Sequence, residues 1–456
     1  MSGEIKRRLK PLVRPRDQWT PIDEALYSPE DIFRVDDKKA EQLRFAAIKY
    51  SFEHHYKNNA FYQRLCQSEK VSPSDIKGTP DLYKIPLIPD TFFKDYPSIA
   101  GFYEWLQRIS SVKLPDIKIK KNNKSFDTVI EALSERNFTV TYTSGSSGKY
   151  SFYPRDELTW LRQRYSVGST LAEWVRSEYE TGDPHMVCLS SFQHPDKTLL
   201  FTGKVAGAGY EMMIDPENRV YLINRKVTTD TLRIAMGRPR NFKERIIARF
   251  VKSSRQKMLM DLRRYIEMYS KLGRNFIIVA PPFLVDALLI LLEAEGKKFE
   301  LGKHVWLFTG GGWKMQSGET VTGSEWRARI KAVLGIPEDN CRDGYGMSEC
   351  SAYFPDCEGH YKHIPHSIVF PMLLDDELKP VKNGNTGRLA FLDPIPNSYP
   401  GFIITGDRVT MLPHCPVCNR PGPVFTQDIS RIGGVESRGC AEIAGELMSN
   451  EMQKTK

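Results

Sequence analysis

The sequence predicts an α/β fold with parallel sheets, because short apolar runs alternate with longer helical patterns through the middle of the chain. Residues 276–280 form a strand candidate that Pro281-Pro282 ends. Residues 283–295 then have the apolar spacing of a helix, which Gly296 closes. Strand, turn and helix in repetition are typical of parallel sheets covered by helices.

A second buried strand candidate covers residues 305–308 and ends in Gly310-Gly311-Gly312. Before this region, residues 40–66 have the spacing of an amphipathic helix. Residues 1–40 are rich in proline and charge and are expected to form an extended arm. A main domain is expected over residues 41–407. The Cys-, Pro- and Gly-rich residues 408–456 are expected to form a small, truncated C-terminal lobe.

Composition excludes several classes of protein. The formal net charge of +9 is moderate for 456 residues, and the motifs of nucleic-acid binding are not found. No segment approaches the roughly 20 apolar residues of a membrane span, and no apolar core follows the basic N-terminus as in a secretory signal. Eight cysteines are too sparse for a secreted disulfide scaffold. We therefore expect a cytoplasmic protein with reduced thiols.

A Ser/Gly-rich segment follows a short β-type run at residues 138–142. Its sequence is Thr143-Ser144-Gly145-Ser146-Ser147-Gly148-Lys149. Glycines let the backbone bring N–H groups close to an anion, hydroxyls add donors, and Lys149 adds a point charge. The glycine spacing differs from that of a Walker loop. Taken alone, the segment fits a flexible turn as well as it fits a phosphate site.

Two further blocks follow at domain-scale spacing. They are Asp343-Gly344-Tyr345-Gly346-Met347-Ser348-Glu349 and Thr405-Gly406-Asp407-Arg408. In this order the three blocks resemble the signature motifs of the adenylate-forming superfamily of acyl-CoA synthetases, luciferases and peptide-synthetase adenylation domains. The resemblance implies a large N-terminal domain of sheets flanked by helices. It also implies that the protein uses ATP and Mg²⁺ to activate a carboxylic acid as its acyl-AMP.

The same resemblance implies roles for single residues. Residues 143–148 would close over the ATP phosphates, and Gly311 and Gly312 would let the backbone approach the adenine edge. In the second block Tyr345 would stack on adenine, beside Gly346, Met347 and Ser348, and Glu349 would hold Mg²⁺. Asp407 would accept both ribose hydroxyls. Each role suits the residue type, since a carboxylate binds a hard cation and accepts hydrogen bonds from a diol.

The C-terminal part departs from most of the superfamily. The segment Arg431-Ile432-Gly433-Gly434-Val435-Glu436-Ser437-Arg438-Gly439 resembles the hinge that opens a full C-terminal domain, but no counterpart of that domain's distal lysine is found. From about Tyr50 to Glu442 the chain resembles the acyl-protein synthetases of the bacterial luminescence fatty-acid reductase, which are short relatives of phenylacetate–CoA ligases. Such enzymes activate a fatty acid, move the acyl group onto their own cysteine and pass it to a partner reductase.

Cys440 directly follows Arg438-Gly439 and is the expected acyl acceptor. A cysteine fixed on the hinge loop would take the place of the thiol of coenzyme A, and tethering raises the effective concentration of a nucleophile. A free thiol has a pKa of about 8.5, which Arg438 or a helix N-terminus would lower. The alternative is a buried structural cysteine.

Cys415-Pro416-Val417-Cys418 has the spacing with which two thiolates bind one Zn²⁺. Cys357 with His360 or His363 would complete a tetrahedral site. The segment resembles a Cys…His segment of phenylacetate–CoA ligase relatives, and this resemblance, aligned on Leu373-Leu374-Asp375, implies His363 rather than His360. Such a zinc would be structural. Four unconnected residues are the alternative.

Two other functions stay open. One is adenylation of a small aryl or amino acid for transfer to an external amine, thiol or carrier protein. The other is a nucleotide-binding module without turnover, although Glu349, Asp407 and the hydroxyl-rich loop are all intact.

Overall fold

The computed structural model describes residues 3–119, 123, 125–144, 149–174, 186–235, 239–310 and 322–432. The chain forms two compact units, and each is built from segments that are distant in sequence. The first unit contains residues 1–10, 167–346 and 353–362, and the second contains residues 11–166, 347–352 and 363–456. This division differs from the expected boundaries at 40/41 and 407/408, because one strand, β14 (Phe402–Leu412), runs through the second of these.

The first unit is built on a six-stranded sheet in the order β5-β4-β6-β7-β8-β9. All neighbours are parallel except the last pair. The strands are β4 (Val187–Gln193), β5 (Arg219–Ile223), β6 (Phe276–Val279), β7 (Val305–Gly310), β8 (Cys341–Tyr345) and β9 (Phe354–Pro355). The helices are α1 (Gly3–Leu9), α9 (Gly207–Met213), α10 (Thr229–Ala235), α11 (Phe242–Lys271), α12 (Pro282–Ala294) and α13 (Gly323–Leu334). The predicted strands at 276–280 and 305–308 and the helix at 283–295 are confirmed.

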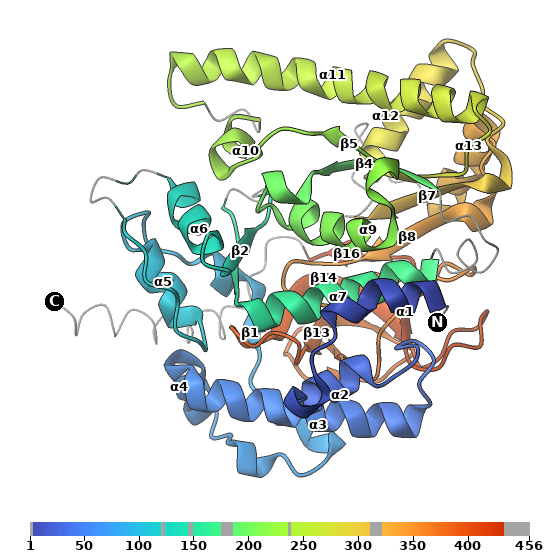
Figure 1. Ribbon diagram of the computed structural model, residues 1–456. Coiled ribbons are helices and arrows are strands. Elements are labelled where there is room, and N and C mark those ends of the chain that lie inside the picture. Colours follow the sequence, from blue (N-terminus) through green and yellow to red (C-terminus); the bar gives the residue numbers. More distant parts are fainter. Residues whose placement is uncertain are drawn as a thin grey trace. The chain divides into compact units, whose positions relative to one another are not determined.

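The core of this unit lies between one face of the sheet and three helices, α11, α12 and α13. Alternate strand residues point to that face, among them Leu189, Ile278 and Leu307, and α12 contributes a run of buried leucines. Such period-two burial is what a parallel sheet covered by helices requires. Figure 1 shows α11 and α9 on opposite sides of β4, so helices cover both faces of the sheet.

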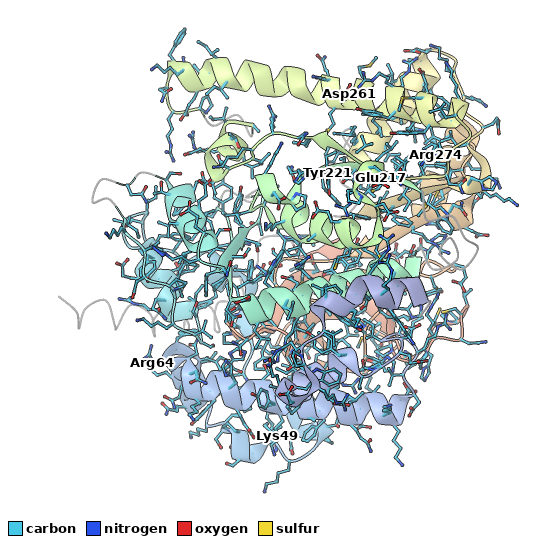
Figure 2. All side chains as sticks on the ribbon, viewed as in Figure 1. Lys49, Arg64, Glu217, Tyr221, Asp261 and Arg274 are labelled. Carbon is cyan, nitrogen blue, oxygen red and sulfur yellow. The ribbon has the colours of Figure 1, made fainter. Side chains whose placement is uncertain are left out.

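Side-chain hydrogen bonds hold the edge strand β5 and the residue that precedes it. The Tyr221 hydroxyl donates to a carboxylate oxygen of Glu211 in α9 at 3.2 Å. Arg274, just beyond the end of α11, donates to the side-chain oxygen of Asn218 at 3.2 Å. Figure 2 labels Tyr221 and Arg274 on this part of the first unit. These side-chain bonds fix the position of a strand that has a neighbour on one side only.

The second unit is built on an eight-stranded sheet in which β10-β15-β14-β13-β11-β12 form the main path and β1 and β16 also pair with β14. Its strands are β1 (Ile88–Pro89), β10 (Lys362–His363), β11 (Phe370–Leu374), β12 (Pro380–Val381), β13 (Thr386–Leu392), β14, β15 (Val424–Phe425) and β16 (Ser430–Arg431). A separate hairpin consists of β2 (Thr139–Tyr142) and β3 (Phe152–Arg155). The predicted strand before the Ser/Gly segment is thus confirmed as β2.

The helices of this region are α2 (Pro21–Tyr27), α3 (Asp37–Asn58), α4 (Ala60–Ser68), α5 (Phe102–Ile109), α6 (Phe126–Ser134) and α7 (Glu157–Trp174). The single helix expected over residues 40–66 is wrong, because Asn59 interrupts it with an extended backbone. Its side-chain oxygen accepts the backbone N–H of Tyr62 at 2.9 Å and caps α4. Its amide nitrogen donates to the Ile109 carbonyl at 3.0 Å. A tertiary contact therefore sets the break. No helix among the described residues is long and apolar enough to cross a membrane.

The extended arm expected over residues 1–40 is also wrong. In the first unit α1 buries Ile5 and Leu9, and Arg8 forms an ion pair with Asp215 at 2.7 Å. In the second unit α2 follows a capping box in which Thr20 and Asp23 bond each other's backbone N–H. Arg8 and Asp23 of this segment thus have partners that are distant in sequence.

Asp23 is a buried carboxylate on which several second-unit groups converge. Arg162 donates two hydrogen bonds to it at 2.8 and 2.7 Å, and Arg14 donates one at 3.0 Å. The side chains of Asp23 and Arg162 are 0% and 1% exposed. Burial raises the pKa of Asp23, but the hydrogen bonds and charge of Arg162 outweigh it and leave the pKa below its ordinary value.

Asp23→Asn should lower the free energy of unfolding by about 3–5 kcal/mol, because it leaves the guanidinium of Arg162 buried without its counter-charge. Urea unfolding followed by circular dichroism measures this loss, and the exposed Asp17→Asn is the matched control, expected to change stability by less than about 0.5 kcal/mol. Because the pKa of Asp23 is lowered, its contribution is complete above the unfolded-state pKa and disappears as pH falls through the folded-state pKa. A variant as stable as the wild type at neutral pH would contradict this account.

Candidate active site

The Ser/Gly segment is the loop of the β2–β3 hairpin. Tyr142 lies opposite Phe152, and just beyond them the backbone N–H of Thr143 donates to the Ser151 carbonyl at 3.1 Å. The Thr143 hydroxyl accepts the backbone N–H of Ser151 at 2.9 Å. Lys149 is exposed, and its ammonium lies 5.9 Å from the ring centroid of Tyr96. The two ends of the loop are therefore held together while the charge of Lys149 stays accessible.

Glu349 lies in the second unit and is 9% exposed. Burial raises the pKa of its carboxyl, and the charge of nearby Asp90 raises it further. The Ser348 hydroxyl donates to the Glu349 carboxylate at 3.2 Å. Asp90 itself lies 3.6 Å from the ammonium of Lys94. A desolvated carboxylate with a second carboxylate near it is a group that a divalent cation would stabilise.

The turn that carries Glu349 is fastened on both of its sides. The Ser348 carbonyl accepts a hydrogen bond from Arg155 at 2.9 Å, and the backbone N–H of Ser351 donates to Asp393 at 2.6 Å. Asp393 is fully buried, and burial raises its pKa to about 6. The position of Glu349 is thus set by buried polar contacts rather than by surface side chains.

Asp407 lies on β14 directly opposite Arg431 on β16. The Arg431 Nε atom lies 3.1 Å from an Asp407 carboxylate oxygen, and the backbone N–H of Ile432 donates to the Gly406 carbonyl at 2.9 Å. Asp407 is 7% exposed, whereas the side chain of Arg431 is 70% exposed. The carboxylate is therefore fixed by the sheet, and its cationic neighbour faces solvent.

In the first unit the ends of β7 and β8 carry the remaining predicted residues. Asp343 accepts the Thr309 hydroxyl at 2.9 Å and pairs with the ammonium of Lys362 at 2.7 Å. The ring of Tyr345 stacks on Phe354, with centroids 5.9 Å apart and an interplanar angle of 21°.

The ring of Tyr353 occupies the space beside the glycines of these strand ends. A Cβ atom at Gly344 or Gly346 would overlap the Tyr353 side chain, and one at Gly310 would lie 2.9 Å from its hydroxyl oxygen. Side chains are thus excluded at three positions by one tyrosine, which explains why the motif has glycine there.

Cys357, His363, Cys415 and Cys418 each place one ligand atom within 4.8 Å of the others. The Cys418 sulfur lies 3.3 Å from the Nε2 atom of His363. His360 instead places its Nδ1 atom 3.1 Å from an Asp356 carboxylate oxygen. Three thiols and one imidazole at this spacing fit the donor set and size of a tetrahedral zinc site. The preference for His363 over His360 agrees with this geometry.

Comparison with known proteins shows which family the chain resembles. Residues 250–449 match the family model described as acyl-protein synthetase, LuxE. Over 395 residues the chain is 22% identical to a long-chain-fatty-acid–luciferin-component ligase of Vibrio harveyi, covering 85% of this chain and 84% of that protein. It is 27% identical over 182 residues to a protein of the same name from Aliivibrio fischeri, covering 40% and 47%. The chain is thus similar to LuxE acyl-protein synthetases.

Solved structures show which fold the chain has. An open conformation of 2-hydroxyisobutyryl-CoA ligase, in complex with its acyl-AMP and CoA, aligns with a TM-score of 0.57 at 13% identity, covering 95% of this chain and 84% of that one. The postadenylation state of the same ligase also gives 0.57, at 14% identity, covering 92% and 73%. The predicted α/β fold of adenylate-forming ligases is confirmed.

The predicted site residues of the chain divide between the two units. Those described in the second unit are Thr143, Ser144, Lys149, Met347, Ser348, Glu349, Asp407 and Arg431, and those in the first unit are Tyr345 and Gly346. Gly145, Ser146, Ser147, Gly148, Gly311, Gly312 and Cys440 lie outside the described residues.

Sequence reasoning missed Asp90, Arg155, Tyr353 and Lys362. The segment before Asp90, Ile85-Pro86-Leu87-Ile88-Pro89, does carry a signal, because its apolar residues form the strand β1 that pairs with β14. Arg155 and Lys362 are buried. No local sequence pattern predicts that these two cations lie inside the protein.

Proposed function

We propose that this protein activates a long-chain fatty acid with MgATP as its acyl-AMP, releasing pyrophosphate, and then transfers the acyl group to a thiol. The observation that carries the proposal is Glu349, a carboxylate desolvated in the second unit on a turn that buried polar contacts fasten. The charge of the nearby Asp90 carboxylate adds to the desolvation of Glu349, which is an environment that a divalent cation would stabilise. The similarity to a long-chain-fatty-acid–luciferin-component ligase over 85% of this chain supports the substrate class.

In the proposed first step a carboxylate oxygen of the acid attacks the α-phosphorus of ATP. The bond from the α-phosphorus to its bridging oxygen breaks, and pyrophosphate leaves. N–H and hydroxyl groups of residues 143–148 and the ammonium of Lys149 offset the charge on the phosphoryl oxygens. Glu349 would hold the Mg²⁺ that accompanies ATP, and this ion would neutralise phosphate charge. Asp407 accepts the ribose hydroxyls, and the ring of Tyr345 contacts the adenine.

Pyrophosphate release with ATP, Mg²⁺ and a series of acids from acetate to octadecanoate tests the proposal. Long-chain acids should give the highest rates. Asp407→Ala should weaken ATP binding about tenfold or more, since each lost hydrogen bond to a charged acceptor contributes about 1.5–3 kcal/mol. Asp376→Ala is the matched control, because Asp376 is 86% exposed and pairs with the neighbouring Arg408. Release with small aryl or amino acids alone would favour the small-acid function, and ATP binding without any release would indicate a module without turnover.

The proposed acyl acceptor is Cys440. The stretch that matches the acyl-protein synthetase model includes this residue. In the second step the Cys440 thiolate attacks the acyl carbon of the acyl-AMP, AMP leaves, and a thioester forms. An acyl-accepting reductase or carrier protein would then receive the group.

Incubation with ATP and a radiolabelled fatty acid should leave label on the protein that neutral hydroxylamine removes. Cys440→Ser should still release pyrophosphate, because adenylation precedes transfer, but should lose the hydroxylamine-labile label. Cys66→Ser, which changes a buried cysteine of α4, is the control and should keep it. Labile label that survives in Cys440→Ser would assign the acceptor to another cysteine.

We further propose that Cys357, His363, Cys415 and Cys418 bind one structural Zn²⁺. The proposal rests on their mutual spacing within 4.8 Å and on their donor chemistry. Within the second unit, the ion would hold the loop between β14 and β15, which carries Cys415 and Cys418, against His363.

Elemental analysis of chelator-washed protein should give close to one zinc per chain, and Cys415→Ser/Cys418→Ser should have none. The double variant should also unfold at a lower temperature, because metal binding contributes to folding free energy. Cys188→Ser, a buried cysteine outside this group, should retain the metal. Folded wild-type protein that contains no metal would refute the zinc site.

A further inference from the structure

Arg155 is a fully buried cation at the end of β3, with an exposed fraction of 0%. Burying a guanidinium is costly unless its donors are satisfied. Here Nε donates to the Gln163 side-chain oxygen at 2.6 Å, and one terminal nitrogen donates to the Ser348 carbonyl at 2.9 Å. The other terminal nitrogen donates to the Thr141 hydroxyl and to the Tyr153 carbonyl.

These acceptors belong to two segments that the proposed chemistry needs. Thr141 and Tyr153 lie opposite each other on β2 and β3. The next pair, Tyr142 and Phe152, flanks the Ser/Gly segment 143–149, here called the phosphate loop. Ser348 immediately precedes Glu349, about two hundred residues further along the chain. The planar fork of Arg155 therefore fixes the Glu349 peptide to the base of the loop hairpin. Its own orientation is set by Gln163 and by the rings of Tyr153 and Tyr399, whose centroids lie 5.6 and 5.8 Å from its central carbon.

We propose that Arg155 is a positioning residue that sets Glu349 relative to the phosphate loop and so determines how effectively Mg²⁺ assists nucleotide binding and adenylation. The inference rests on the proposed function of Glu349 and the loop. Residues that orient a metal ligand through a hydrogen bond typically change affinity or activity about 10–100-fold when they are replaced. A lysine keeps the charge, but it cannot reproduce the fixed directions of the guanidinium donors.

The test compares two buried arginines of the second unit. In Arg155→Lys, kcat for pyrophosphate release should fall about 10–100-fold and the Mg²⁺ concentration for half-maximal activity should rise, while KM for the fatty acid stays within about twofold. Arg162→Lys is the matched control, because Arg162 is 1% exposed and donates to Asp23 and Thr20 rather than to the Glu349 turn. It should lose stability but keep the wild-type kcat and Mg²⁺ dependence.

A second variant keeps the proposal testable if Arg155→Lys does not fold. Thr141→Val retains the arginine and a side chain of similar size but removes one acceptor from its fork. It should shift kcat and Mg²⁺ dependence in the same direction by a smaller factor. The proposal would be overturned if Arg155→Lys and Arg162→Lys lost stability equally and all three variants kept the wild-type Mg²⁺ dependence. That result would show that Arg155 is merely structural.

Calorimetric titration with ATP, in Mg²⁺ and in EDTA, gives a readout that needs no turnover. Mg²⁺ should increase the affinity of the wild type and of Arg162→Lys for ATP, and this increase should fall about tenfold in Arg155→Lys. If the wild type binds MgATP but activates no acid, the proposed reaction fails while this comparison still decides the role of Arg155. An ATP affinity of the wild type that Mg²⁺ leaves unchanged would overturn the positioning role directly.

Discussion

Backbone hydrogen bonds along β14 position many of the polar residues of the candidate site in the second unit. β13 lies antiparallel to it, and β1 pairs with it in parallel at residues 403 and 404, so that Asp90 follows directly from the end of β1. Further along, β16 places Arg431 opposite Asp407, and β15 closes the loop that contains Cys415 and Cys418. A shift of one residue in this strand would turn Asp407 to the other face of the sheet. Register therefore decides where the carboxylate lies.

Local patterns predicted those parts of the fold that are determined locally. The strand at 276–279 is buried throughout and is followed by a helix beginning at Pro282, and both features are legible in a short stretch of sequence. The first 40 residues were misassigned because their partners are remote. Arg8 pairs with Asp215, and Asp23 pairs with Arg162. A charge-rich segment looks solvated until its counter-charges are known.

In the candidate site, too, the sequence predicted the residues that a local motif marks and missed those whose partners are remote. The spacing of Cys415 and Cys418 predicted a thiolate pair, and the structure places the expected Cys357 and His363 with it. Glu349 was recognisable from its motif, but Arg155 was not, because an arginine inside a strand usually faces water. Its hydrogen bond goes to the carbonyl of Ser348, which lies 193 residues further along the chain. A residue that positions a distant segment through a hydrogen bond, as Arg155 does, has no sequence motif of its own.

The position of Tyr353 has an evolutionary consequence. Its ring lies where a Cβ atom at Gly344 or Gly346 would be, and its hydroxyl lies close to Gly310. An alanine at either motif glycine would therefore be tolerated only together with a smaller residue at 353. Conversely, removing the ring would relax the requirement for glycine at both positions. The tyrosine and the glycines thus form a coadapted set, so that substitutions in it should accumulate jointly when related sequences diverge.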